Sequence, residues 1–246
     1  MSSDSPLQIS RSLLAAMGTR MFVYHEDRIP KHSAVVVVSN HRGFMDAPLL
    51  MAALGHPIRI ACHHYMGNVP MLREIVTQLG CFPLQEPESR QQAFFEQATR
   101  LLQEHQWVGV FPEGAQPMVR YTKPDALAKF HRGFAHLALR TEVRDLAVLP
   151  VAIASLEETT TSAVPLSLLR LFDPSEPLFA QPGWHPMVIH RRVAVLVGHP
   201  YWITPKQRDQ YQGKQAKLAV SQLVTTCQDE ISKLLYQIFQ REQMLF

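Results

Sequence analysis

The sequence predicts an α/β fold, in which a mostly parallel sheet is flanked by helices in a single domain with helical additions at its N- and C-terminal ends. Short β-branched apolar runs such as Ala34–Val38 alternate with capped amphipathic segments, which is the pattern of strand–helix–strand units. The 246 residues are 46% hydrophobic, which suffices for a substantial core and excludes general disorder. No internal repeat or low-complexity tract divides the chain.

Charge and cysteine content exclude several classes of protein. The net charge of +3 comes without a basic run, so nucleic-acid binding is not expected. Cys62, Cys81 and Cys227 are far apart and form no CxxC pair, which indicates a reducing compartment and neither a disulfide framework nor a zinc site. The longest apolar stretches, 47–55 and 146–154, are shorter than the ~18–20 residues that span a bilayer, and no signal-peptide pattern is present. We expect a cytoplasmic protein that is soluble or bound to a membrane surface.

Residues 1–30 are predicted to form an N-terminal helical segment. Ser5–Gln8 combines a serine N-cap, a proline at the first helical position and a glutamine three residues after the cap. Ile9, Leu13 and Met17 follow at four-residue spacing and define an apolar face. Two interpretations remain open: this face, with Phe22, enters a membrane interface, or it packs on the core as an ordinary terminal helix.

Residues 31–205 are predicted to hold the α/β core. Its first strand, Ala34–Val38, is continuously apolar and is therefore expected to be buried on both faces. Because proline donates no backbone hydrogen bond, Pro150 is expected only near the end of its strand or at a sheet edge. The further predicted strands are Ile58–Cys62, Cys81–Leu84, Trp107–Phe111 and Leu146–Ile153, and the predicted helices are Ala47–Leu54, Met71–Leu79, 89–105 and Gly133–Arg140.

The last third of the chain departs from this alternation. Five prolines between positions 156 and 186 predict an irregular excursion within the domain, whose Leu178, Phe179 and Trp184 form a second candidate contact surface. Val188–Val197 is predicted to be a strand or a strand pair. Residues 206–246 are predicted to form a long helix from about Lys206, and its wide apolar stripe favours packing on the core.

A polar segment follows the first core strand. In open α/β sheets, ligands bind at the carboxyl ends of the strands, so His41 emerges at a favourable position. If the chain turns between them, the Asp46 carboxylate can accept a hydrogen bond from the Nδ1–H group of His41. Nε2 would then be available to remove a proton from an alcohol. The alternative is that Asp46 is only the N-cap of the next helix.

A second segment, Phe111–Gly114, also follows a predicted strand and should reach the same edge of the sheet. Asn40-His41-x4-Asp46 and Phe-Pro-Glu-Gly, in this order, resemble the first and third motifs of the glycerophospholipid acyltransferases, the PlsC-type family. Phe130–Gly133 and Val148–Val151 are similar to further family motifs. The resemblance extends over about residues 35–154.

This resemblance implies transfer of a fatty acyl group from acyl-CoA or acyl carrier protein to a hydroxyl of a lysophospholipid or related lipid-like acceptor. His41 would be the general base and Asp46 its orienting partner, while Glu113 and Gly114 would line the acceptor site. It implies no metal and no cofactor beyond the acyl donor, because a thioester is already reactive. The expected partners are the two substrates and a membrane surface, on which the protein would be peripheral.

The sequence departs from the family pattern at the positions of two phosphate-binding arginines. Glu86 stands where the second motif has arginine, and Ala115-Gln116-Pro117 replaces Thr-Arg-Ser after the third. Other cations are candidates to bind a phosphate, namely Arg42, Arg90, Arg120, Lys123 and Arg132. Otherwise the acceptor lacks a phosphate monoester, or the protein is a catalytically silent, lipid-binding relative.

Cys62, His63 and His64 are potential metal ligands next to one another. Neighbouring histidines on an extended segment point in opposite directions, and no fourth ligand follows at a zinc-like spacing. The segment is therefore interpreted as a loop that lines the acceptor cleft.

Overall fold

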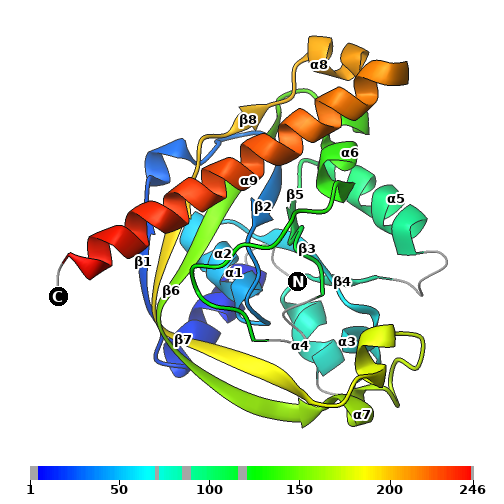
Figure 1. The fold of residues 1–246 in the computed structure, drawn as a ribbon. Helices are drawn as coiled ribbons and strands as arrows, with labels where there is room; N and C mark the ends of the chain where they lie inside the picture. The colour runs from blue at the N-terminus through cyan, green and yellow to red at the C-terminus, as the bar shows by residue number, and fades with distance from the viewer. Residues whose placement is uncertain (1–4, 70–71, 85–89, 116–120, 245–246) are drawn as a thin grey trace.

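A computed structural model describes residues 5–69, 72–84, 90–115 and 121–244, which form one sheet with helices on both faces (Figure 1). The strands of these residues are β1 (Arg20–Tyr24), β2 (Ala34–Ser39), β3 (Ile58–Cys62), β4 (Phe82–Pro83), β5 (Trp107–Val110), β6 (Leu146–Pro165), β7 (Trp184–Val197) and β8 (Tyr201–Trp202). They pair in the order β1-β7-β6-β2-β5-β3-β4, with β8 on β6. Only the pairings of β6 with β7 and β8 are antiparallel among these strands, which confirms the predicted fold class.

The central strand β2 explains the two-layer core. All its residues are buried, as predicted, and they alternate between the faces of the sheet. Val36 and Val38 pack in the cluster that contains α5, α6 and α9, whereas Val35 and Val37 pack in the cluster that contains α1 and α2. The described helices are α1 (Ser5–Ala16), α2 (Asp46–Leu54), α3 (His64–Asn68), α4 (Leu72–Gln78), α5 (Arg90–Gln103), α6 (Gly133–Arg140), α7 (Leu166–Leu169), α8 (Pro205–Gln210) and α9 (Gly213–Gln243), with short 3₁₀ turns η1 (Glu26–Arg28) and η3 (Pro177–Ala180).

The N-terminal helix packs on the core, which is the second of the two interpretations left open. Leu7 and Leu14 of α1 are buried in the same cluster as α2, and Leu13 packs against that cluster. Residues 20–24 form a strand, β1, that the sequence analysis did not predict, and it pairs in parallel with β7. Phe22 lies on this strand and remains 46% exposed.

The prediction for Pro150 was wrong. Pro150 lies inside β6 and is in register with Val38 of the central strand β2. Its carbonyl accepts a hydrogen bond from the Gly198 N–H at 2.8 Å, on the side where β7 has ended and β8 has not begun. The N and C=O groups of one strand residue point to the same side of the strand. The Pro150 nitrogen, which carries no hydrogen, therefore faces the space between the end of β7 and the start of β8, where no backbone hydrogen bond of the sheet is lost.

The prediction of an irregular excursion over 156–186 was also wrong in part. Strands β6 and β7 continue as an antiparallel ribbon as far as the pair Pro165 and Trp184, with α7 and η3 in the connection. Thr159, Thr160 and Thr161 lie in this ribbon, and such β-branched residues favour strands. The prolines are confined to the connection and to the ends of the ribbon, where a missing backbone donor disturbs the ladder least.

The predicted C-terminal helix is two helices. Thr204 caps α8 in a capping box with Gln207, and Pro205 occupies its first position. A break at residues 211–212 precedes α9, which buries Val220, Cys227 and Ile231 against the sheet. Within the described residues, no helix is both long and apolar enough to cross a membrane.

Candidate active site

The segment after β2 is fixed by a side chain that bridges to the neighbouring strand. The Asn40 Nδ2 group donates to the Ile153 carbonyl at 2.9 Å, and the Ile153 N–H donates to Asn40 Oδ1 at 2.8 Å. Asn40 is only 2% exposed, so both hydrogen bonds are shielded from water. Asn40 therefore fixes the point from which His41 leaves the sheet.

His41 and Asp46 meet as the sequence predicted. His41 Nδ1 lies 2.8 Å from Asp46 Oδ2, and Asp46 is fully buried as the first residue of α2. The same carboxylate oxygen accepts the backbone N–H groups of Arg42 at 2.5 Å and Gly43 at 2.9 Å. Asp46 thus binds the loop that precedes it and is not the N-cap, which is Met45.

The environment of Asp46 keeps its carboxylate charged. Burial by itself would raise the pKa of Asp46, but hydrogen bonds and charge interactions with His190 and His41 hold this pKa well below its usual range. An anionic Asp46 accepts hydrogen bonds only, so His41 carries its proton on Nδ1. In the neutral form of this ring, the nitrogen without a proton is then Nε2.

His190 is a third member of the site, which the sequence analysis missed. It is 1% exposed on β7, and its Nε2 lies 3.2 Å from Asp46 Oδ1. Its Nδ1 lies 2.8 Å from Ser155 Oγ on β6, so the hydroxyl donates to Nδ1 and Nε2–H donates to Asp46. The only available signal was a histidine inside an apolar strand, and no spacing linked it to position 46, which is 144 residues away.

The His41 ring is also held from the third motif. It stacks on Phe111 with ring centroids 4.2 Å apart, and its backbone N–H donates to Glu113 Oε1 at 2.8 Å. The other oxygen, Glu113 Oε2, accepts the Ala128 N–H at 2.6 Å. Burial raises the pKa of Glu113. Glu113 was expected to line the acceptor site, but the structure uses its carboxylate to join two backbone segments.

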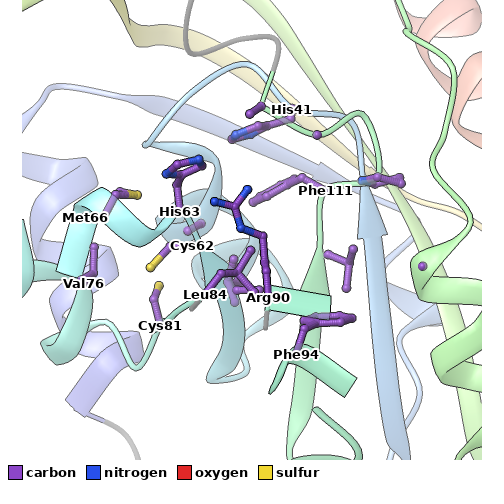
Figure 2. Close-up of a pocket in the computed structure, with 18 of the residues that line it drawn as sticks. His41, Cys62, His63, Met66, Val76, Cys81, Leu84, Arg90, Phe94 and Phe111 are labelled. Atoms are coloured by element: carbon purple, nitrogen blue, oxygen red, sulfur yellow. The ribbon is translucent and has the colours of Figure 1, made fainter. Parts of the chain in front are cut away.

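A cavity of ≈ 620 Å³ opens beside His41 (Figure 2). This volume falls in the range of ~300–1,000 Å³ that is typical of ligand pockets. Gly114 lines this cavity with φ at +76°, and a Cβ atom there would come within 3.3 Å of the His131 ring. Most of the wall is apolar, with side chains that include Ile60, Met66, Val76, Leu84, Phe94, Val110 and Phe134.

The candidate phosphate-binding cations have different positions. Arg42 is buried, and its guanidinium binds both oxygens of Glu158 at 2.5 and 3.1 Å, so it is not directed into the cavity. Arg132 and Lys123 are exposed and do not line the cavity, and Arg120 lies outside the described residues. Among the arginines of the described segments, Arg90 alone lines the cavity, and its Nη1 lies 3.6 Å from Glu176 Oε2.

Cys62 and His63 contribute to the cavity wall, but the segment is not a loop, because Cys62 ends β3 and His64 begins α3. His63 Nε2 lies 2.7 Å from Glu176 Oε2, and its Nδ1 lies 3.6 Å from Asp173 Oδ2. Burial lowers the pKa of His63. Cys62 also lines the cavity, and burial raises the pKa of its thiol to about 12, which keeps it protonated and weakly nucleophilic.

Comparison with known proteins was made by sequence and by structure. A family model described as "Acyltransferase" matches residues 20–154. The chain is 26% identical over 137 residues to 1-acyl-sn-glycerol-3-phosphate acyltransferase of Borreliella burgdorferi, covering 55% of this chain and 52% of the relative. It is 29% identical over 179 residues to an uncharacterised protein of Mycobacterium tuberculosis, and the match covers 67% of this chain and 47% of the relative. The chain thus spans about half the length of these curated relatives.

The fold is similar to the crystal structure of the 1-acyl-sn-glycerophosphate acyltransferase PlsC from Thermotoga maritima. The TM-score is 0.60 at 16% sequence identity, and the alignment covers 95% of this chain and 78% of the other. At this identity the similarity establishes the arrangement of strands and helices. The function is therefore inferred from the residues at the site.

Proposed function

The chain belongs to the acyltransferase family, and from this premise we propose that it transfers a fatty acyl group from a thioester to a hydroxyl. The donor in this proposal is acyl-CoA or acyl carrier protein, and the acceptor is a lysophospholipid or a related lipid-like alcohol. One observation carries the proposal. His41, bonded at 2.8 Å to the fully buried Asp46, lines a largely apolar cavity of ≈ 620 Å³.

The proposed reaction uses His41 as the general base. Its Nδ1–H is bonded to Asp46, so Nε2 is available to take the proton of the acceptor hydroxyl. The alcohol oxygen forms a bond to the thioester carbonyl carbon, and the C–S bond then breaks. The protonated His41 returns its proton to the departing thiolate, so the enzyme ends in its starting state. The Asp46 charge stabilises the imidazolium that forms between the two proton transfers.

The cavity supports a lipid substrate. Its wall of aliphatic and aromatic side chains can bury an acyl chain, and His41 and Gly114 belong to the same wall. Arg90, as the arginine of the described segments that lines the cavity, is our candidate to bind an acceptor phosphate. Since the proposed substrates are membrane lipids, the proposal includes association with a membrane surface.

A catalytically silent, lipid-binding protein is the second candidate. It is favoured by the engagement of Arg42 with Glu158 and by the absence of arginine at the two positions where the family pattern has it. Such a protein would retain the cavity and hold an acyl chain without turnover. The bonded His41–Asp46 pair favours the enzyme, because mere storage does not require an oriented base.

Labelled acyl-CoA and acyl carrier protein, each with a panel of lysolipids, provide the test. The wild-type protein should form labelled diacyl product, and His41→Ala should not, while both bind fatty acid equally. His56→Ala is the matched control, because His56 is exposed and lies outside the cavity wall. Equal transfer by wild type and His41→Ala would disprove the base assignment, and lipid binding without turnover by the wild type would favour the second candidate.

A further inference from the structure

The β6–β7 ribbon ends in an exposed apolar surface, which we call the ribbon tip and define as residues 164–187. Figure 1 shows the ribbon curving away from the sheet towards α7, which lies beside α3. Leu168 is 46% exposed, Leu171 75%, Trp184 54% and Met187 41%. Several large apolar side chains exposed together on one surface indicate an interaction site.

The exposed charge on the ribbon tip itself has one sign. Between residues 159 and 189, which are all described, the only exposed Asp, Glu, Lys or Arg side chain is Arg170. The two acidic residues, Asp173 and Glu176, are 1% and 7% exposed and both face His63. The ribbon tip itself, residues 164–187, therefore exposes apolar side chains and a cationic group and no carboxylate.

The exposed apolar side chains of the ribbon tip belong to a well-packed segment. The tip has its own small core, in which Leu166, Leu169 and Phe179 are buried with Tyr65 of α3. This core positions the backbone, so Leu168, Leu171 and Trp184 point outward from an ordered support. Keeping apolar side chains in contact with water is unfavourable, and a surface that covers them would recover that free energy.

The tip is continuous with the cavity. His185, which follows Trp184, lines the cavity, and its Nε2 lies 3.2 Å from the hydroxyl of Tyr65, which also lines it. A layer in contact with the tip would therefore lie next to residues that border the proposed lipid site. The lipids of that layer would have a short path to His41.

We propose that the ribbon tip docks on a bilayer that contains anionic lipid. Leucine and tryptophan side chains would enter the boundary between headgroups and acyl chains, and Arg170 would interact with lipid phosphates. The charge pattern favours this occupant, because an exposed cation without exposed carboxylates matches an anionic surface. The inference that docking delivers lipid to the cavity rests on the proposed function. The inference that the ribbon tip docks on a bilayer does not depend on that function.

Vesicle co-sedimentation tests the proposal on the full chain. The tip variant Leu168→Ser/Leu171→Ser/Trp184→Ser should bind vesicles of phosphatidylethanolamine and phosphatidylglycerol about tenfold or more weakly than wild type. The matched control is Trp202→Ser/Leu218→Ser, which removes exposed apolar side chains from β8 and α9, away from α7 (Figure 1). It should bind as wild type does. Arg170→Glu should weaken binding to these vesicles and leave binding to phosphatidylcholine vesicles unchanged.

Further readouts separate docking from catalysis. Brominated lipids should quench the part of the protein fluorescence that comes from Trp184, which is the part that Trp184→Phe lacks. The tip variant should still transfer acyl groups to lysolipid dispersed in detergent but should lose transfer to lysolipid in vesicles. The proposal is overturned if the wild type does not bind vesicles, if the tip variant binds as tightly as wild type, or if the control loses as much. A tip-dependent dimer without vesicle binding would also overturn it, in favour of a second copy. Tip-dependent vesicle binding by a protein that transfers no acyl group would sustain docking and contradict the proposed function instead.

Discussion

Two histidines that are each paired with a carboxylate, His41 and His63, line the same cavity, and they differ in which ring nitrogen remains available. In the first pair His41 Nδ1 lies 2.8 Å from Asp46 Oδ2, and no described residue bonds its Nε2. In the second pair His63 Nε2 lies 2.7 Å from Glu176 Oε2, and Asp173 faces Nδ1 at 3.6 Å. Figure 2 shows both rings at the cavity.

The comparison shows that a short histidine–carboxylate distance does not by itself make a base. His41 is oriented by the carboxylate on one side and by Phe111 through stacking, and its other nitrogen is left for a substrate. His63 has carboxylates at both nitrogens and binds the ribbon connection to the cavity wall. We therefore expect chemistry from the first pair and stability from the second.

The largest expected effect distinguishes the two histidines directly. His41→Gln should lower kcat by ~10²–10⁴-fold, because the proton of the acceptor alcohol then has no base. His63→Gln should leave kcat near the wild-type value. Steady-state kinetics on both variants provide the measurement, and similar losses in both would contradict the distinction.

The next effect concerns the carboxylate of the first pair. Asp46→Asn should lower kcat by about 10²-fold or more with little change in KM, because the asparagine amide can donate to Nδ1 and stabilise the wrong tautomer of His41. Glu176→Gln is the control in the second pair and should retain kcat. A rise in KM alone for Asp46→Asn would count against its orienting role.

A smaller effect is expected at His190, which acts on the base only through Asp46. His190→Gln should lower kcat roughly tenfold at unchanged KM, as observed for groups that orient a functional residue. Ser155→Ala should have a weaker effect in the same direction, and an unchanged kcat with a raised KM in His190→Gln would contradict this positioning role.

The second pair should influence stability more than rate. Glu176→Ala leaves His63 Nε2 buried without its 2.7 Å partner, so the free energy of unfolding should fall by ~1–3 kcal/mol. Denaturant unfolding measures the change. The control is Glu74→Ala, at a side chain that is 53% exposed, where little loss is expected. If Glu176→Ala is as stable as wild type, the pair does not hold the ribbon connection in place.

The smallest expected effect is a gradual change with pH in the difference in unfolding free energy between wild type and Asp46→Asn. The pKa of Asp46 is lower in the folded than in the unfolded chain, where an aspartate has a pKa of about 3.9. Its contribution to stability is therefore complete above that pH and is lost as the pH falls towards the folded-state pKa. The difference in unfolding free energy between wild type and Asp46→Asn should shrink below about pH 4. A constant difference down to pH 2 would contradict the depressed pKa.

Much of the fold followed from local pattern. The β2 run is apolar at each of its positions from 34 to 38, so burial on both faces was predictable, and α6 begins and ends where predicted. The β6–β7 ribbon was not predicted, because the prolines of residues 156–186 were taken to indicate irregular structure. The pairing of β6 with β7, which confines these prolines to the ends of the ribbon and to its connection, is not visible in the sequence. Pro150 was missed because the gap between β7 and β8 depends on where two distant segments end.

The amino-acid sequence alone determined the strand–helix alternation, the family resemblance and the pair His41 and Asp46, since these depend on residues that are near one another along the chain or belong to ordered motifs. Tertiary structure decided which side chains join that pair and which do not. It brought His190 to Asp46, used Glu113 to bind backbone N–H groups and paired Arg42 with Glu158. The physical reason is that a buried polar group must find a partner, and that partner is chosen by proximity in space across the sheet, which no spacing along the chain encodes.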